Sequence, residues 1–234
     1  IHNGFITVNK EKMSKSLGNF FTIRDILKKY DAEVVRLFML SSHYRSPIEF
    51  SQDQLRDAEV SLDRYYTTIS RIDEFLDSYA SEKPKMDMTA ADKLKRCTQQ
   101  LHSQFIEAMD DDFNTALAVG YLFEFIRELN RFLDTKPYAP SAQPILSDAV
   151  ETLRVIGGVL NLFCRTPHQW NLDLLRTRQI PLSEDDILQK IRDRSEARSR
   201  KDWAKADAIR QELADAGIAL EDKKDGTSWR VTIG

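Results

Sequence analysis

Apolar residues recur at intervals of three and four along most of this 234-residue chain, which is the pattern of amphipathic α-helices. The first twenty residues differ from this pattern. Asn3-Gly4 is a turn dipeptide, and residues 5–8 favour a short strand. Residues 10–19 are polar and show no apolar periodicity, so they are expected to form a mobile loop.

Two helices are predicted after this loop. Thr22 with Asp25 has the spacing of a capping box, and Asp31 is placed to cap a second helix over residues 32–40. That second helix carries apolar residues on more than one side, which predicts that it is buried. Residues 41–47 are expected to form a loop.

The longest periodic segment begins at Ser51, which has Gln54 three residues later, and predicts one continuous helix. Its apolar face consists of Leu55, Ala58, Leu62, Tyr65, Ile69, Ile72, Leu76 and Tyr79. The polar stretch of residues 81–88, which contains Pro84, ends the pattern.

Three further helices are predicted at about residues 90–109, 114–133 and 145–163, each with an apolar stripe. An acidic turn at residues 110–114 separates the first two helices. Pro137, Pro140 and Pro144 separate the second from the third. Helices joined in this way bury their stripes against one another as an antiparallel bundle.

A linker is expected at residues 166–181, and a pair of capped helices follows it. Ser183 with Asp186 predicts the start of a helix that runs to about Lys201. Asp202 predicts the start of a second helix that ends at Gly217, a residue suited to a left-handed C-terminal cap.

The chain ends in a predicted β-hairpin. Residues 218–220 are apolar, Asp225-Gly226 is a turn dipeptide, and residues 229–233 alternate as in a strand with one buried face. Two helices and a hairpin in about fifty residues form a small α+β domain.

Composition places the chain among globular proteins, with 41% hydrophobic and 30% charged residues. No apolar run reaches the roughly 18–20 residues that span a bilayer, so no membrane partner is expected. Cys97 and Cys164 lie in helical apolar patterns and are expected to be reduced, buried residues of a cytoplasmic protein. Because the first residue is Ile1 rather than Met, the chain is expected to be a fragment or a processed product.

The net charge of −3 does not by itself favour nucleic acid, but the uneven distribution of charge suggests one localised anionic partner. Eight basic and four acidic residues lie between Lys190 and Arg210, so this stretch carries +4 and the rest of the chain −7. The residues Lys190, Arg194, Arg198, Lys201 and Lys205 would form one basic stripe if the two helices were nearly continuous. The interleaved acidic residues leave a second interpretation open, which is a solvated, salt-bridged helix face.

The sharpest motif is Lys-Met-Ser-Lys-Ser at residues 12–16. A flexible loop with two ammonium groups and two hydroxyls has the chemistry to close over a polyphosphate and to stabilise charge on a departing pyrophosphate. Taken alone, the string is also compatible with an ordinary solvated surface loop.

No metal site is predicted, because the histidines are scattered without ligand spacing. The four are His2, His43, His102 and His168. The acidic run of residues 110–112 lacks the spacing of a calcium loop and is better explained by a helix N-terminus that favours negative charge.

Several segments together resemble the cysteinyl-tRNA synthetase family of class I aminoacyl-tRNA synthetases, in its C-terminal portion. Besides residues 12–19, the family-like segments are His2-Asn3-Gly4, residues 31–36, residues 41–47, residues 108–115, and the C-terminal stretches 217–222, 226–227 and 229–230. These segments span nearly the whole chain.

The resemblance implies a two-step reaction, in which ATP activates cysteine to cysteinyl-adenylate and cysteine is then transferred to tRNA(Cys). It implies that Lys15 and Lys12 are the catalytic residues of this loop. It also implies that ATP binds to Lys15, Lys12, Met13, Ser14 and Ser16, and that the residues around Lys15 shape the loop. The cofactors implied are ATP with Mg, and Zn in the full-length enzyme. The family's His-x-Gly-His motif and zinc ligands are expected upstream of Ile1, in a missing N-terminal catalytic half. The chain alone is therefore expected to be inactive.

The resemblance also implies that the last domain reads the tRNA anticodon, with Arg198, Trp203, Asp207 and Asp222 as contacts. Carboxylates accept hydrogen bonds from guanine, arginine donates to bases or phosphates, and tryptophan stacks on unpaired bases. The alternative that Trp203 is a core residue stays open at this stage.

The predicted fold is mostly α. It has the end of a class I Rossmann catalytic domain with the Lys-Met-Ser-Lys-Ser loop (residues 1–50), a helical bundle (51–165) and a small α+β anticodon-binding domain (182–234). Three alternatives to this family are a synthetase of the arginyl or methionyl type, a related ligase that joins cysteine to an amino-sugar, and a tRNA-binding module without catalysis. The small C-terminal domain argues against the first two.

Overall fold

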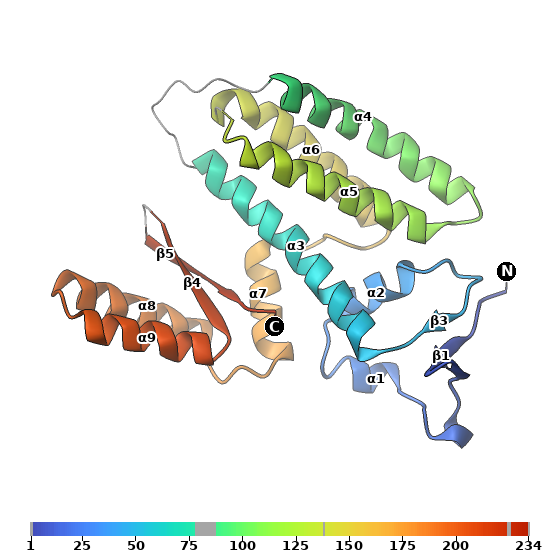
Figure 1. Ribbon diagram of the computed structural model, residues 1–234, viewed down its shortest axis with the longest axis horizontal. Helices are drawn as coiled ribbons and strands as arrows, with labels where there is room; N and C mark the ends of the chain where they lie inside the picture. The colour runs from blue at the N-terminus through green and yellow to red at the C-terminus, as the bar shows by residue number, and fades with distance from the viewer. Residues whose placement is uncertain (1, 78–87, 138, 224–225, 234) are drawn as a thin grey trace. The chain divides into compact units, whose positions relative to one another are not determined.

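The structure is a computed structural model that describes residues 2–77, 88–137, 139–223 and 226–233 (Figure 1). The residues form two compact units. The first consists of Ile1–Leu27 and Ala32–Pro167, and the second of Lys28–Asp31 and His168–Gly234. The division into three domains stays a prediction, and residues 1–27 share a compact unit with the helical bundle.

A small sheet holds the N-terminal segment in the first unit. Its strands are β1 (Ile6–Val8), β2 (Glu11–Lys12) and β3 (Ile48–Glu49), in the order β2-β1-β3. β1 pairs antiparallel with β2 and parallel with β3. The strand predicted at residues 5–8 is thus confirmed. The polar loop is less irregular than expected, because it contains β2 and a short 3-10 helix, η1 (Lys15–Leu17).

Two helices follow the loop, as predicted. α1 (Ile23–Ile26) is capped by Thr22, whose hydroxyl accepts the backbone N–H of Asp25 at 3.1 Å. α2 (Ala32–Leu40) buries Val34, Leu37 and Phe38 on one face. The predicted burial of this helix is thus confirmed for one face, whereas Val35 and Leu40 are only partly buried and Met39 is exposed.

The four long helices of the first unit form the predicted bundle: α3 (Gln52–Asp77), α4 (Met88–Asp110), α5 (Thr115–Asp134) and α6 (Ala139–Val159). α4 packs along both α5 and α6, and α3 also contacts both (Figure 1). Their buried faces include Leu55, Leu62, Ile69, Leu94, Leu101, Leu122, Ile126, Leu146 and Leu153. Tyr79 and the polar stretch 81–87 lie outside the described residues.

The start of α6 was predicted wrongly. The helix begins at Ala139, so Pro140 and Pro144 lie within it rather than in a linker, and it ends at Val159. Pro140 is in the first turn, where a backbone N–H has no helical partner to lose. The burial of Ala142 and Leu146 supplies the packing that outweighs the missing N–H at Pro144.

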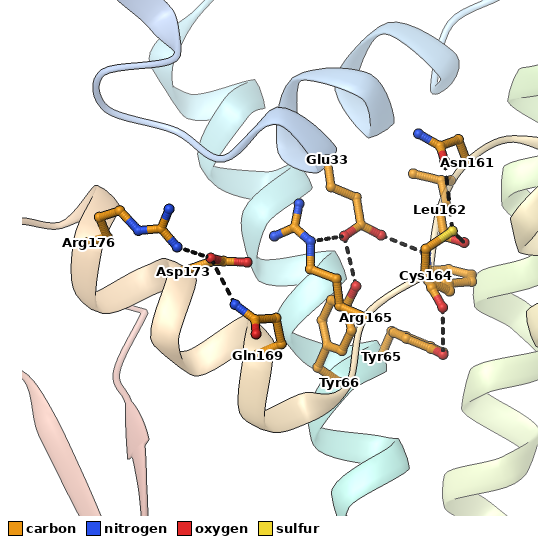
Figure 2. Close-up of polar contacts among 11 residues, drawn as sticks. Glu33, Tyr65, Tyr66, Asn161, Leu162, Cys164, Arg165, Gln169, Asp173 and Arg176 are labelled. Carbon is orange, nitrogen blue, oxygen red and sulfur yellow. Dashed lines mark hydrogen bonds and ion pairs between the residues drawn. The ribbon is translucent and has the colours of Figure 1, made fainter. Parts of the chain in front are cut away.

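A buried carboxylate on α2 joins α2 to α3 and to the segment after α6 (Figure 2). Glu33 is 5% exposed, and its Oε2 accepts the hydroxyl of Tyr66 at 2.7 Å. Its Oε1 accepts the backbone N–H of Phe163 at 2.6 Å, and the guanidinium of Arg165 lies 3.9 Å from Oε2. The rings of Tyr65 and Phe163 stack with centroids 3.9 Å apart.

The second unit contains a helix that the sequence did not predict. α7 (Pro167–Thr177) occupies most of the expected linker at 166–181 and buries Trp170 and Leu174. The side chain of Asn171 accepts the backbone N–H of Val231 at 3.0 Å, which fastens α7 to the C-terminal hairpin.

The rest of this unit agrees with the sequence. α8 (Glu184–Ser199) begins with the Ser183–Asp186 capping box, and α9 (Trp203–Asp215) with the side chain of Asp202 as its cap. Gly217 has φ of 84°, the left-handed conformation that favours glycine after a helix. The strands β4 (Ile218–Lys223) and β5 (Gly226–Val231) form the antiparallel hairpin. The second strand begins earlier than predicted, at Gly226, and ends at Val231 rather than at Ile233. The predicted turn residue Asp225 lies outside the described residues.

The two cysteines differ from their predicted burial. Neither Cys97 nor Cys164 forms a disulfide, but Cys97 is only partly buried and Cys164 is exposed. Cys164 comes after the end of α6, so it does not lie on the apolar stripe assumed from the sequence. In the described part of the chain, no helix combines the length and apolar character needed to cross a membrane.

Candidate functional site

The Lys-Met-Ser-Lys-Ser segment forms a tight, hydrogen-bonded loop in the first unit. Lys12 ends β2, and the backbone N–H of Met13 donates to the carbonyl of Ile6 at 2.9 Å. Ser14 caps η1, with its hydroxyl accepting the N–H of Leu17, and its Oγ lies 2.9 Å from that of Ser16. The two serines therefore shape the loop through local contacts.

Residues beyond the motif close the loop. The N–H of Ser14 donates to the side-chain oxygen of Asn19 at 2.8 Å. Gly18 has φ of 70°, where a side chain would be strained. These two contributions explain why a glycine and an asparagine follow the motif.

The two motif lysines are exposed and lie over different aromatic rings. Lys12 Nζ is 3.9 Å from the ring centroid of Phe5, and Lys15 Nζ is 5.4 Å from that of Phe20. Cation–π contacts at exposed positions stabilise by only about 0.5–1 kcal/mol. Both ammonium groups can therefore leave these rings at little cost when an anion approaches.

The turn at residues 41–47 is tied to the acidic turn between α4 and α5. Asp112 Oδ1 accepts the hydroxyl of Tyr44 at 2.7 Å, and Oδ2 lies 2.6 Å from Arg45 Nε. The Tyr44 hydroxyl and then the Arg45 guanidinium lower the pKa of the Asp112 carboxyl. Asp112 thus anchors the turn, while Asn114 caps α5 by accepting the N–H of Leu117. The explanation of residues 110–112 by a helix N-terminus that favours negative charge did not predict the contacts of Asp112 with Tyr44 and Arg45.

In the second unit, the basic residues of α8 and α9 do not form one stripe. A turn at Arg200 and Lys201, where Lys201 has φ of 60°, separates the two helices. The helices then lie side by side (Figure 1). Lys190 pairs with Glu212 across them at 2.7 Å. The prediction of one basic stripe along nearly continuous helices was therefore wrong. The alternative, a solvated helix face with salt bridges, describes much of the exposed surface of α8 and α9.

Asp222 on β4 is the centre of a charged cluster. Its Oδ1 accepts Arg194 Nη1 at 2.7 Å and the hydroxyl of Thr227 at 2.9 Å. Its Oδ2 accepts Arg194 Nη2 at 2.9 Å and Arg198 Nη1 at 3.0 Å. Hydrogen bonds from Arg194, and then from Thr227, hold the pKa of the Asp222 carboxyl well below its usual range.

The members of this cluster differ in burial. Arg194 is 6% exposed, whereas the side chains of Arg198 and Asp222 are close to half exposed. The structure thus joins two of the four predicted anticodon contacts, Arg198 and Asp222. A third, Asp207, is exposed on α9 and adds to the effect of Asp222 in raising the pKa of Arg194.

Trp203, the fourth predicted contact, is not a core residue. It is the first residue of α9 and is 58% exposed, so that alternative was wrong. An exposed indole at a helix start offers a flat apolar surface to an incoming ring.

The described residues show no group of three or more His, Cys, Asp or Glu side chains that could hold a metal ion. His43 and His168 each lie near a single carboxylate, Asp112 at 3.9 Å and Glu184 at 3.4 Å. Neither pair has the ligand count of a zinc site.

The position of Arg194 differs from the one expected from the sequence. The residue is not part of a solvated basic face, because it lies on the buried face of α8 with Ile187 and Ala197. Its spacing of seven residues from Ile187 and three from Ala197 was the available signal, because an arginine in such a register needs a partner.

Three families match successive parts of the chain. Residues 1–60 match the class I (C) tRNA synthetase catalytic domain, residues 104–164 the DALR domain, and residues 191–230 the cysteinyl-tRNA ligase anticodon binding domain. The loop at 12–16 lies in the first match, and the Asp222 cluster in the third.

Curated relatives match over the whole chain. A cysteine--tRNA ligase of Thermodesulfovibrio yellowstonii is 52% identical over 100% of this chain and 47% of the relative. Ligases of the same name from Geobacter metallireducens and Syntrophotalea carbinolica are 44% and 46% identical over 99% and 98% of the chain. The chain therefore spans about half the length of these relatives, because each match covers only 47% of the relative.

A solved structure shares part of the fold. It is the ternary complex of the Agrobacterium radiobacter K84 agnB2 LeuRS with tRNA and LeuAMS, with a TM-score of 0.55 and 18% identity. The similarity covers 75% of this chain and 22% of that chain. The consecutive family matches and the relatives along the full chain lead to one assignment: the chain belongs to the cysteinyl-tRNA synthetase family, as a C-terminal portion.

Proposed function

We propose that this chain is the part of a cysteine--tRNA ligase that supplies the Lys-Met-Ser-Lys-Ser loop and the anticodon-binding region. The observation that carries the proposal is the 52% identity with a cysteine--tRNA ligase along the entire chain. The complete reaction uses ATP to activate cysteine as cysteinyl-adenylate and then transfers cysteine to tRNA(Cys). The loop and the Asp222 cluster serve different substrates of that reaction.

In the first step, the carboxylate of cysteine attacks the α-phosphorus of ATP, and pyrophosphate leaves. We assign Lys15, with Lys12, to contact ATP and to stabilise the charge that develops on the pyrophosphate. Both ammonium groups are exposed and only weakly held by their aromatic neighbours. Met13, Ser14 and Ser16 keep the loop backbone in the shape that presents the lysines.

Mg²⁺ enters this step with ATP, whose phosphates supply oxygen ligands. The zinc ion expected for the family has no candidate ligand set among the described residues. The proposal therefore places zinc and the His-x-Gly-His motif in the part of the relatives that this chain does not span, and the isolated chain is expected not to form the adenylate.

In the second unit, the proposal assigns anticodon contacts to Arg198, Trp203, Asp207 and Asp222. Trp203 offers an exposed ring for stacking on an unpaired base, and Asp207 offers an exposed carboxylate acceptor. The free N–H groups of Arg198 can donate to a base or a phosphate. A cytoplasmic location, with tRNA(Cys), ATP and cysteine as partners, belongs to the same proposal.

A chimera tests the catalytic assignment. Residues 1–234 would replace the matching part of the Thermodesulfovibrio yellowstonii ligase, and ATP–pyrophosphate exchange would be measured with cysteine. We expect exchange in the chimera and none in the isolated chain. A chimera that folds and binds tRNA but shows no exchange would contradict the proposal.

The tRNA-binding module without catalysis is the second candidate, because the chain spans only about half of its relatives. Binding of the isolated chain to tRNA(Cys), with no gain of exchange in the chimera, would favour this candidate. Exchange in the chimera would favour the ligase.

A further inference from the structure

Arg194 and Arg198 both contact Asp222, but their surroundings differ. Arg194 approaches from the buried face of α8 and gives two parallel hydrogen bonds, one to each carboxylate oxygen. Arg198, one helical turn further along α8, gives a single bond at 3.0 Å and is 45% exposed. Two parallel bonds fix the plane of a carboxylate, whereas one bond from an exposed side chain does not.

The carboxylate of Asp222 has little free capacity. Each oxygen has two acceptor positions, and the four are taken by two bonds from Arg194, one from Arg198 and one from Thr227. A base that bonds to Asp222 must therefore replace one of these donors. Arg198 and Thr227 are the exchangeable ones, because solvent reaches both. Arg194 is not exchangeable, because its guanidinium would lose its carboxylate partner while remaining buried.

We propose that Arg194 is a positioning residue for anticodon reading. It holds the Asp222 carboxylate in a fixed plane while a base of the anticodon replaces Arg198 or Thr227 as a hydrogen-bond donor to that carboxylate. The inference rests on the proposed function of this unit. Arg194 itself touches no RNA, so its contribution is to the choice between anticodons rather than to the general attraction for phosphates.

Binding measurements on the 234-residue chain test this role. The probes are a tRNA(Cys) transcript and the same transcript with an altered anticodon, each titrated across a salt series. The variants are Arg194→Lys, which keeps the charge but removes the paired donors, and Arg194→Gln. Arg192→Gln is the matched control, because Arg192 is an exposed arginine on the same helix that bonds to Gln189.

We expect Arg194→Lys to reduce the preference for the correct anticodon about tenfold, the size typical of losing a well-oriented base contact. Binding of the altered transcript and the dependence on salt should stay as in the parent chain. A direct phosphate contact would instead weaken both transcripts alike and lower the salt slope by about 0.7. Arg192→Gln should leave the preference unchanged.

The outcomes separate this inference from the proposed function. If the parent chain binds both transcripts equally, the proposal that this unit reads the anticodon is contradicted, and the inference about Arg194 is contradicted as well. If the parent chain discriminates but Arg194→Lys and Arg194→Gln discriminate as well, only the role of Arg194 is overturned.

Nuclear magnetic resonance of the parent chain tests the role of Arg194 without any variant, and therefore also if the variants fail to fold. In nuclear magnetic resonance spectra of the parent chain, the guanidinium N–H signals of Arg194 should persist unshifted when tRNA(Cys) is added. The signals of Arg198 should shift as its donor moves from Asp222 to the RNA. A shift of the Arg194 signals comparable with that of Arg198 would overturn the inference.

Discussion

The Glu33 carboxylate accepts the hydroxyl of Tyr66 at 2.7 Å, although both residues are almost completely buried. This contact joins α2 to α3 within the first unit, and the same carboxylate binds the backbone N–H of Phe163 after α6 (Figure 2). One charged group thus links three segments that are far apart in the sequence. Removing a partner from such a buried cluster leaves polar groups unsatisfied.

Glu33→Gln should therefore destabilise the first unit. The amide presents an NH₂ group to neighbours that are themselves donors, and the expected loss is about 1–3 kcal/mol in the free energy of unfolding. Urea unfolding followed by circular dichroism measures this change. Glu107→Gln, on the exposed face of α4, is the control and should be close to neutral. Equal midpoints for the two variants would show that Glu33 does not hold these segments together.

Alkaline pH should destabilise the same region. Burial raises the pKa of Tyr65 to about 12, and burial and then Glu33 raise the pKa of Tyr66 further. In the unfolded chain, tyrosine ionises near pH 10. The folded state then binds more protons than the unfolded state, so stability is lost as the pH rises above about 10.

Unfolding midpoints measured from pH 8 to about pH 11 check this expectation. Tyr66→Phe should lower stability at neutral pH, since Glu33 loses a donor, but it should make the alkaline decline shallower. An unchanged decline in both Tyr65→Phe and Tyr66→Phe would assign the effect to other groups.

Lys15→Ala should slow adenylate formation in the chimera by at least tenfold while tRNA affinity changes little. The reason is that Lys15 is proposed to stabilise the leaving pyrophosphate, and each loss of about 1.4 kcal/mol in transition-state stabilisation slows the step tenfold. ATP–pyrophosphate exchange is the measurement. Lys95→Ala removes the same charge from an exposed position on α4 and should leave exchange intact. Equal rates of ATP–pyrophosphate exchange in both variants would contradict the proposed role of Lys15.

Trp203→Ala should weaken binding of tRNA(Cys) by about 1–3 kcal/mol, the size of one base–aromatic stack. It should leave the melting temperature nearly unchanged, because the side chain is 58% exposed. Trp170→Ala is the contrasting variant, since Trp170 is 1% exposed and its loss should unfold the second unit. A large loss of stability in Trp203→Ala would contradict the exposed position.

Acid should weaken the second unit through Asp222. Because the pKa of this carboxyl is lowered in the folded state, its stabilising contribution is complete above its usual pKa, near 4. The contribution is lost as the pH falls below that value toward the folded pKa. The three tryptophans, residues 170, 203 and 229, lie in the second unit, so their fluorescence reports its unfolding. Asp222→Asn should be less stable at neutral pH, and its difference from the parent should shrink in acid.

The sequence by itself determined the features that depend on nearby residues. The apolar period located the long helices, and the caps at Thr22, Ser183 and Asp202 set where helices begin, because each acts within three residues along the chain. The motif at residues 12–16 and the similar C-terminal segments identified the family, which the relatives confirm.

The tertiary structure decided what depends on distant residues. The segment before Ser183 that was expected to be a linker contains the helix α7, because Trp170 and Leu174 are buried in a hydrophobic core. The helix α6 includes Pro140 and Pro144, because packing compensates for a missing backbone N–H. Arg194 and Lys190 look alike in the sequence, yet the fold buries one against Asp222 and leaves the other in a surface pair with Glu212. The partner of a charged side chain is fixed by which segments meet in space, and a periodic pattern along one helix does not contain that information.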